Sequence, residues 1–292
     1  MKNNVFKYIT VSEEDKECGV YLYVAGEATI EKNTEYPPKG HPSSYSFNLN
    51  TGRTLYEYQL NYITEGFGIF ENKYGKFRVT PGTIIILFPG EWHRYRPLKS
   101  TGWKEHYIGF NGVLASKLLK SEFFKLEQPI IRVNFHKELL DIFYRILEQI
   151  MNEKAGYQLV ASGLTIAYIG QIIATIKNKE FEGKDIEQKI KQACVIMRDN
   201  LNRNINAFAI ARELSIGYSY FRKMFKKYTG VSPLQYHLQL RIKQAEDMLS
   251  STNKSMKEIA YDLGFSSFFY FSRLFKQKTG VNPTDFRKVK KM

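Results

Sequence analysis

Two stretches of the sequence place arginine and lysine at helical spacing opposite a row of aromatic residues. They are FRKMFKKYTGVSP, starting at residue 221, and FSRLFKQKTGVNP, starting fifty positions later at residue 271. Residues three or four apart share one face of a helix, so each stretch would present its basic residues together. A guanidinium group can donate two parallel hydrogen bonds to guanine in the major groove of DNA, and nearby lysines can contact phosphates. The repeat therefore predicts two DNA-reading helices.

The two helices are expected to bury one face and to offer the other to DNA. The predicted core residues are Tyr218, Phe221 and Phe225 in the first helix and Phe268, Phe271 and Phe275 in the second. The predicted DNA-contacting residues are Ser219, Arg222, Lys223 and Lys226 in the first helix and Phe269, Ser272, Arg273 and Lys276 in the second. Phe269 has two interpretations, contact with a thymine methyl group or burial in the core.

The charge distribution favours the same third of the chain. The protein has 292 residues and a net charge of +14, and residues 185–292 hold 20 Lys and Arg against 9 Asp and Glu, a net charge of +11. Residues 1–184 therefore carry only +3. A domain this basic indicates a polyanionic partner such as double-stranded DNA, although a merely solvated basic surface is the alternative.

Each predicted reading helix follows a short helix and a tight turn. Ala211 and Ala260 stand where the short helix would pack closely on the next one, and Ser215 and Gly264 stand in the turns. Glycine adopts the positive φ that such a turn often needs at little cost. Ser266 is expected to cap the second reading helix. Gly217 occupies the cap position of the first, where the missing side chain predicts a softer helix start.

A capped helix start follows each reading helix. Ser232 and Pro233, with Gln235 three residues past the serine, form one such start, and Asn282 and Pro283 begin the other. The run from Pro233 predicts a continuous helix ending near Leu249, roughly 16 residues and about 24 Å long. A rigid connector of this size could hold both reading helices against successive segments of the major groove.

Residues 186–292 resemble the DNA-binding domain of the AraC/XylS family of transcription regulators. The resemblance is carried by IAYDLGFSSFFYFSRLFKQKTGVNPTDFRK (259–288) and by Arg241, Ala245 and Leu249 in the connecting helix. It implies an all-α domain at 185–292 with helix-turn-helix units at about 206–229 and 255–278. The first unit departs from the family pattern, because Ser215 and Gly217 replace the usual Gly and Ser.

The N-terminal part is predicted to be β structure. Short alternating runs at 56–63, 66–72, 76–80 and 83–88 are interrupted by Gly and Pro, which is typical of a small barrel or sandwich. The stretches TPGTIIILFPGEWHRYRP (80–97) and GWKEHYIGFNG (102–112) resemble the cupin-like effector domain of the same family. The expected architecture is therefore a two-domain chain, with a cupin-like β-barrel at 1–130 followed by helices and the all-α domain.

The resemblance to sugar-responsive members implies a small-molecule site at the mouth of this barrel. The expected ligand-binding residues are Arg53, Gln59, Trp92, Tyr95, Trp103, Glu105 and Tyr107. Aromatic faces with a few polar groups are typical of a small-ligand site, although the same aromatic residues could be core. His93 and His106 lack the clustered partners of a cupin metal centre, so we expect no metal, no cofactor and no enzyme.

Residues 131–180 are predicted to be helical and to join two subunits. One helical stripe is apolar and consists of Leu139, Ile142, Phe143, Ile146 and Ile150. Such a stripe either packs on its own barrel or pairs two chains, and the family resemblance favours a homodimer.

The remaining features predict a cytoplasmic protein. The N-terminus lacks the layout of a signal peptide, and the sequence suggests no apolar run approaching the roughly 18 residues of a membrane span. Cys18 and Cys194 are too few for a disulfide framework or a thiolate metal cluster.

The function expected from these features is sequence-specific transcription regulation in response to a small molecule, with a sugar or related metabolite as the effector. The family resemblance favours an activator, which would also contact RNA polymerase. Two alternatives stay open, a regulator whose N-terminal domain binds a protein and a metal-dependent cupin enzyme fused to a DNA-binding tail.

Overall fold

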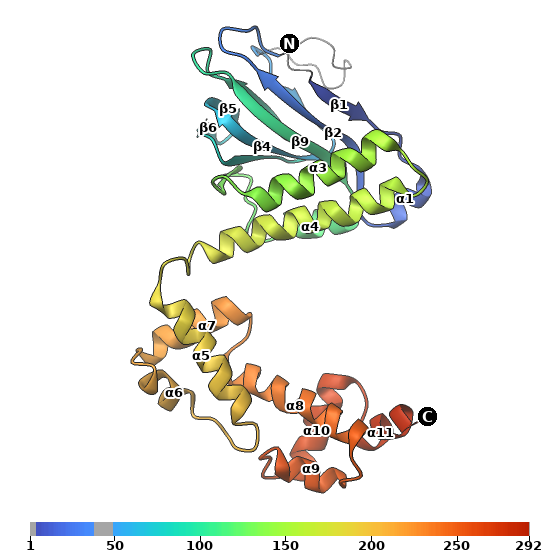
Figure 1. Ribbon diagram of the computed structural model, residues 1–292, viewed down its shortest axis with the longest axis vertical. Coiled ribbons are helices and arrows are strands. Elements are labelled where there is room, and N and C mark those ends of the chain that lie inside the picture. Colours follow the sequence, from blue (N-terminus) through green and yellow to red (C-terminus); the bar gives the residue numbers. More distant parts are fainter. Residues whose placement is uncertain (1–3, 38–48, 292) are drawn as a thin grey trace. The chain divides into compact units, whose positions relative to one another are not determined.

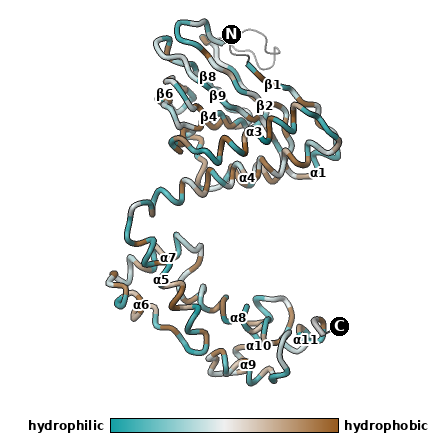
Figure 2. The backbone as a smooth tube through the Cα atoms, viewed as in Figure 1, coloured by the Kyte–Doolittle hydropathy of each residue, from teal (hydrophilic) through white to brown (hydrophobic). Residues whose placement is uncertain are grey.

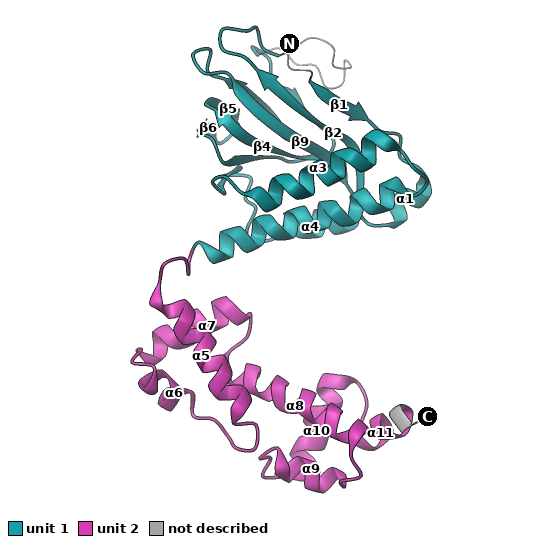
Figure 3. Cartoon of the chain, in the orientation of Figure 1, with its two compact units in different colours: residues 1–179 teal, residues 180–292 magenta. Residues whose placement is uncertain are grey.

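The computed structural model describes residues 4–37 and 49–291 and divides the chain into two compact units, Met1–Lys179 and Glu180–Met292 (Figure 3). The first unit contains two antiparallel sheets with helices, and the second is entirely helical. The predicted class of each part is confirmed, but the β part consists of two separate sheets in the described residues rather than one closed barrel.

The first unit is built on a six-stranded and a four-stranded sheet. The first sheet has the order β1 (Val5–Tyr8), β2 (Tyr21–Ile30), β9 (Trp103–Asn111), β4 (Tyr58–Gly66), β7 (Thr83–Leu87) and β10 (Ile130–Arg132). The second has the order β3 (Arg53–Thr54), β8 (Trp92–Pro97), β5 (Gly68–Asn72) and β6 (Gly75–Val79). Two short helices, α1 (Glu13–Glu17) and α2 (Val113–Leu119), and two longer ones, α3 (Lys137–Asn152) and α4 (Tyr157–Asn178), complete the unit.

The alternation of side chains along β9 divides the interior of this unit into two layers. Trp103 packs with Ile85 and Phe70 in a cluster that draws on both sheets. Phe110 points to the opposite face of β9 and belongs to a larger cluster shared with the helices. Because neighbouring residues of a strand face opposite ways, Glu105 lies on the Trp103 side. The sequence of one strand therefore supplies both the inter-sheet layer and the helix-facing layer.

Helices α3 (Lys137–Asn152) and α4 (Tyr157–Asn178) pack beside each other on the six-stranded sheet (Figure 1). Leu139, Phe143, Ile146 and Ile150 are at most 1% exposed in the core that these helices share with the sheet. The predicted subunit interface on this stripe is therefore not available to a partner, because the chain's own sheet and α4 already cover it. Ile142 also packs against the same core.

Helix α4 is an apolar segment of 22 residues, long enough to cross a membrane by length and composition alone, so the expectation that no apolar run approaches that length is wrong (Figure 2). Its inward face carries polar groups that bind strand backbone. Gln158 Nε2 donates to the Leu22 carbonyl at 2.9 Å, and Ser162 Oγ donates to the Val20 carbonyl at 2.6 Å. These bonds dock α4 on β2 as a helix of the folded unit. Its exposed face consists of Leu159, Val160, Gly163, Ala167 and Gly170.

The second unit contains seven helices among its described residues. They are α5 (Asp185–Asp199), α6 (Ala207–Glu213), α7 (Tyr218–Thr229), α8 (Pro233–Ser251), α9 (Met256–Asp262), α10 (Phe268–Thr279) and α11 (Pro283–Lys291). They form two hydrophobic clusters, one joining α5, α6 and α7 and the other joining α9, α10 and the later part of α8. Each predicted reading helix therefore belongs to a core of its own, and α8 spans both.

Candidate nucleic-acid interface and effector site

Helices α7 and α10 bury the aromatic face that the sequence predicts. Phe221 and Phe225 of α7 are fully buried, as are Phe271 and Phe275 of α10. Within each helix the two rings lie 5.5 and 5.7 Å apart. This aromatic packing fixes the rotation of each helix about its own axis, because turning the helix would expose both rings.

The opposite faces of α7 and α10 are polar, basic and open to solvent. The structure exposes Ser219, Arg222, Lys223 and Lys226 on α7 and Phe269, Arg273 and Lys276 on α10, while Ser272 is half-buried. Phe269 is 84% exposed, so the interpretation of this residue as core is wrong. All eight predicted DNA-contacting residues thus lie on the two faces that the cores leave open.

Each of the two central arginines lies against a tyrosine of its own helix. The Arg222 guanidinium is 5.6 Å from the centre of the Tyr218 ring, and the Arg273 guanidinium is 5.8 Å from that of Tyr270. Such a contact is worth about 0.5–1 kcal/mol at an exposed site. It reduces the rotamers that a free arginine would sample, so less entropy is lost when the side chain binds a base.

The turns before α7 and α10 have the same left-handed backbone but different residues. Ser215 has φ 54° and Gly264 has φ 69°. A side chain at 264 would place its Cβ 2.5 Å from the Asn202 carbonyl oxygen, so only glycine fits there. Ser215 has a Cβ atom, so the same left-handed conformation is strained at this position.

The N-caps of the reading helices differ from the prediction in one residue. Ser267, not Ser266, caps α10 and accepts a hydrogen bond from the Tyr270 amide, because α10 begins at Phe268. Gly217 caps α7 without a side-chain bond, as predicted.

The connecting helix α8 contains 19 residues, about 28 Å at 1.5 Å per residue, and starts with the predicted capping box of Ser232 and Gln235. Arg241, buried at 4% exposure, is a functional candidate that the sequence analysis named only as part of a family pattern. Its Nη1 donates to Asn204 Oδ1 at 3.0 Å, and its Nε donates to the Leu263 carbonyl. Arg241 therefore ties α8 to the loop before α6 and to the turn before α10.

The second candidate site lies between the two sheets of the first unit. Arg53 of β3 donates from Nη2 to the Tyr95 hydroxyl at 2.7 Å and from Nε to His93 Nε2 at 3.3 Å. His93 Nδ1 lies 3.0 Å from the Glu91 carbonyl, which fits the tautomer with hydrogen on Nδ1. Arg53, His93 and Tyr95 thus form one hydrogen-bonded group on the inner face of the four-stranded sheet.

Across from this group, β4 and β9 carry polar atoms that are buried and have no hydrogen-bond partner in the described part of the chain. Five of these atoms are Gln59 Oε1, Asn61 Oδ1, Trp103 Nε1, Glu105 Oε2 and the Tyr107 hydroxyl. Asn61 pairs with Tyr107 across the two strands, so the atoms come from neighbouring positions. A buried polar atom without a partner costs about 1–3 kcal/mol. Five of them on adjoining strands indicate a site whose bonds are completed by a bound molecule or by water.

Burial controls the ionisation of this inner site. It raises the pKa of Glu105 from 4.5 to about 7, against the opposing charge of Arg53. Burial, and to a lesser extent the charge of Arg53, lower the pKa of His93 from 6.5 to about 4. Burial also raises the pKa of the Tyr107 hydroxyl. Near neutral pH the site therefore holds one permanent cation, a neutral imidazole and a carboxyl group close to its midpoint.

Six of the seven predicted ligand-binding residues line this inner site, and Trp92 does not. The Trp92 indole Nε1 donates to the Thr51 carbonyl at 2.7 Å, and the Arg94 guanidinium lies 5.7 Å from its ring. Trp92 and Arg94 share the outer face of β8, whereas His93 and Tyr95 face inward. Asn61 also belongs to this site but was not predicted, although the alternation of β4 would have placed it beside Gln59.

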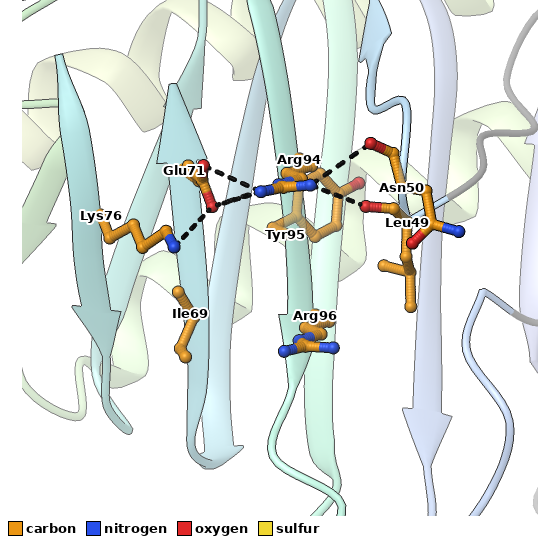
Figure 4. A pocket seen from close by; sticks show the side chains of 8 residues that line it. All are labelled: Leu49, Asn50, Ile69, Glu71, Lys76, Arg94, Tyr95 and Arg96. Carbon is orange, nitrogen blue, oxygen red and sulfur yellow. Dashed lines mark hydrogen bonds and ion pairs between the residues drawn. The ribbon is translucent and has the colours of Figure 1, made fainter. Parts of the chain in front are cut away.

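The outer face of the four-stranded sheet has a separate hollow of about 250 Å³ (Figure 4). An ion pair crosses it, in which Arg94 donates to both carboxylate oxygens of Glu71 and also to the Leu49 carbonyl. The Arg94 guanidinium holds the pKa of Glu71 below its usual value. These contacts join the segment before β3 to β5 and β8. The residues around the hollow therefore mainly hold that segment against the sheet.

The two histidines first considered as metal ligands lie on different faces of the first unit. His93 points between the sheets, whereas the His106 ring lies 5.1 Å from that of Phe143 in α3. Burial lowers the pKa of His106 to about 4. Within residues 4–37 and 49–291, no group of three or more His, Cys, Asp or Glu side chains could hold a metal ion.

Comparison with known proteins gives the same division of the chain. A model of the AraC-like ligand binding domain matches residues 27–168, and a model of a helix-turn-helix domain matches residues 210–289. The lactose operon transcription activator of Staphylococcus xylosus is 22% identical over 70% of this chain and 75% of its own length. The arabinose operon regulatory protein of Escherichia coli is 25% identical over 71% of this chain and 72% of its own length.

A solved structure of a transcriptional regulator with an AraC-type DNA-binding domain, from Chromobacterium violaceum, is 28% identical to the part of this chain that it matches. It covers 36% of this chain and 93% of its own, with a TM-score of 0.35.

Proposed function

Because this chain belongs to the AraC/XylS family of transcription regulators, we propose that a sugar or a similarly hydroxylated metabolite, bound between its two sheets, controls DNA reading by α7 and α10. The protein is a DNA-binding regulator with a ligand-binding N-terminal domain, and it is not an enzyme. The proposal concerns the class of effector and the residues that bind it and the DNA.

The observation that carries the proposal is the set of unpartnered polar atoms on β4 and β9. Three of them, on Gln59, Asn61 and Glu105, are carbonyl or carboxyl oxygens that can accept hydrogen bonds, and the Trp103 indole can only donate. A hydroxyl group both donates and accepts, so a molecule with several hydroxyls could satisfy the whole set.

Aromatic surface beside these atoms suits the other part of a sugar. The Trp103 and Tyr95 rings have centres 6.0 Å apart, and both side chains are buried in the inter-sheet layer. Aromatic faces can cover the apolar C–H surface of a sugar ring while polar side chains bind its hydroxyls. The names of the relatives, which refer to lactose and arabinose operons, support the same class of effector.

A fluorescence titration of the full-length protein with mono- and oligosaccharides tests the proposal. The only tryptophans are Trp92 and Trp103, so the signal reports the first unit, and Trp103 lies in the site. Arg53→Ala and Glu105→Ala should each weaken sugar binding by about tenfold or more, because each removal leaves buried polar groups unpaired. Glu71→Gln, on the outer face of the sheet, is the matched control and should leave the affinity unchanged.

Two results would contradict the proposed class of effector without contradicting the function of the protein as a DNA-binding regulator. A tight response to an apolar compound and none to any sugar would contradict the proposed effector while leaving DNA regulation intact. Binding of a protein in place of any small molecule would instead favour the alternative N-terminal domain function.

We also propose that the protein is a homodimer that pairs through the exposed face of α4. That face carries Leu159 and Val160, 63% and 48% exposed, beside Gly163, Ala167 and Gly170. Small residues allow a second helix to approach closely, and the apolar side chains favour burial. Activation through contact with RNA polymerase belongs to the same proposal, and the relative from Staphylococcus xylosus, a transcription activator by name, supports the activation.

A further inference from the structure

Phe269 is the most exposed phenylalanine in the described residues. It is 84% exposed in the first turn of α10, and its nearest recorded ring partner is the neighbouring Phe268, with centres 6.0 Å apart. A phenylalanine left in water forgoes the stabilisation of burial, so this ring is available to contact a partner outside the folded chain.

The surroundings of Phe269 are those of a DNA-reading surface. Arg273 lies one helical turn later on the same face and is exposed, and Lys276 follows it. Residues four apart on a helix have Cβ atoms about 5–6 Å apart. An apolar ring and a guanidinium group therefore stand side by side on α10.

The internal repeat supplies a built-in comparison. The residue that corresponds to Phe269 fifty positions earlier is Ser219, which is also exposed at the start of α7. The counterpart of Arg273 at the same offset is Lys223, and Arg222 lies beside Lys223 on the exposed face of α7. The two reading helices thus present similar basic groups but differ in an aromatic ring against a hydroxyl.

We propose that Phe269 selects thymine by packing on its 5-methyl group, so that the half of the operator read by α10 requires a thymine that α7 does not. This inference rests on the proposed insertion of α7 and α10 into the major groove. In that groove thymine alone among the four bases presents a methyl group. A phenyl ring has no hydrogen-bonding group, so against any other base it would cover polar edges without satisfying them.

The spacing on α10 also locates the selected base. Neighbouring base pairs are 3.4 Å apart along the DNA axis. Since Phe269 and Arg273 are about 5–6 Å apart at their Cβ atoms, the thymine should lie within two base pairs of the base that Arg273 contacts.

The experiment replaces thymine by deoxyuridine, which removes only the methyl group. The preferred operator is first selected from random DNA with the full-length protein, and each thymine is then replaced singly. Wild type should lose about fourfold in affinity at one position next to the Arg273 contact, the equivalent of one buried methyl group. Phe269→Ser, which copies the residue of α7, should bind the thymine and deoxyuridine operators equally.

Two further variants make the assignment specific. Ser219→Phe should create a new thymine preference in the half of the operator read by α7. Phe135→Ser removes another highly exposed phenylalanine, 73% exposed and in the first unit, and should leave the discrimination unchanged.

Each alternative outcome has a distinct meaning. Specific binding by wild type with no effect of any deoxyuridine would overturn the thymine contact and leave the regulator intact. If Phe269→Ser keeps wild-type discrimination but loses activation by RNA polymerase, the ring contacts protein and the inference is wrong. Failure of wild type to select any DNA would instead contradict the proposed function itself.

Discussion

The guanidinium group of Arg241 lies 3.9 Å from the centre of the Phe265 ring. It also donates hydrogen bonds to the Leu263 carbonyl and to Asn204 Oδ1, which belong to different helix-turn-helix units. Phe265 follows the turn glycine before α10, and Asn204 precedes α6. A buried arginine with a stacked ring and fixed acceptors holds its partners in one geometry. Arg241 therefore fixes the positions of the two helix-turn-helix units along α8.

Replacing Arg241 by methionine should destabilise the second unit by about 1–3 kcal/mol, because the buried Leu263 carbonyl loses its donor. Chemical unfolding followed by far-UV circular dichroism measures this change. The tryptophan fluorescence transition should not move, since both tryptophans lie in the first unit. Lys243→Met, exposed on the same helix, is the control. Equal stability of Arg241→Met and wild type would contradict the structural role.

Arg222→Ala and Arg273→Ala should each weaken binding to the specific operator by about 1–3 kcal/mol and relax selection at different base positions. Lys226→Ala should weaken binding to all sequences alike and reduce the slope of affinity against salt. Selection from random DNA and salt titrations measure these effects. Relaxation at the same base by both arginine variants would contradict the model of two readers.

Glu105 should make the first unit less stable as pH rises. Its folded pKa of about 7 exceeds its usual value of 4.5, so the folded state binds more protons than the unfolded state between those pH values. As the pH rises from 4.5 to 8, the free energy of unfolding of wild type should therefore fall by about 3 kcal/mol relative to that of Glu105→Gln. Unfolding followed by tryptophan fluorescence measures the difference.

The comparison with Glu105→Gln is needed because His93 acts in the opposite direction. Its lowered pKa of about 4 makes stability rise with pH from about 4 to 6.5 in both proteins, so this contribution cancels. A constant difference between the two proteins across the pH range would show that Glu105 titrates normally.

Ala167→Glu should dissociate the proposed homodimer while both units stay folded, because Ala167 is exposed on α4. Ile146→Glu should instead unfold the first unit, since Ile146 is fully buried in its core. Sedimentation gives the mass, and tryptophan fluorescence reports the fold. Arg145→Glu, exposed on α3, is the control. A wild-type monomer at micromolar concentration would refute the α4 interface.

The helical unit could be predicted closely from the sequence, because its signals are local and occur twice. Spacing alone identified the buried aromatic face and the exposed basic face of both reading helices. The position of the α10 cap was wrong by one residue, which is the usual uncertainty of a helix start. The role of Arg241 was not predictable, because its partners Asn204 and Leu263 are distant in sequence.

The first unit shows where sequence patterns become ambiguous. Trp92 was grouped with the ligand-binding residues on the family resemblance, but it is an odd number of positions from Tyr95 along β8 and faces outward. The apolar stripe of α3 revealed a buried face without revealing what covers it. In the structure its cover is the chain's own sheet, which no local pattern encodes.

The rigidity of α8 has a consequence for the promoters that this protein would recognise. A base-pair substitution in a binding site removes one contact, at a cost of about 1–3 kcal/mol. A single inserted base pair between the two contacted segments turns one of them by about 34° about the DNA axis and carries it 3.4 Å away. A 19-residue helix cannot bend to follow. The promoters that this protein recognises should therefore differ in the base sequence of the two half-sites more readily than in the distance between them.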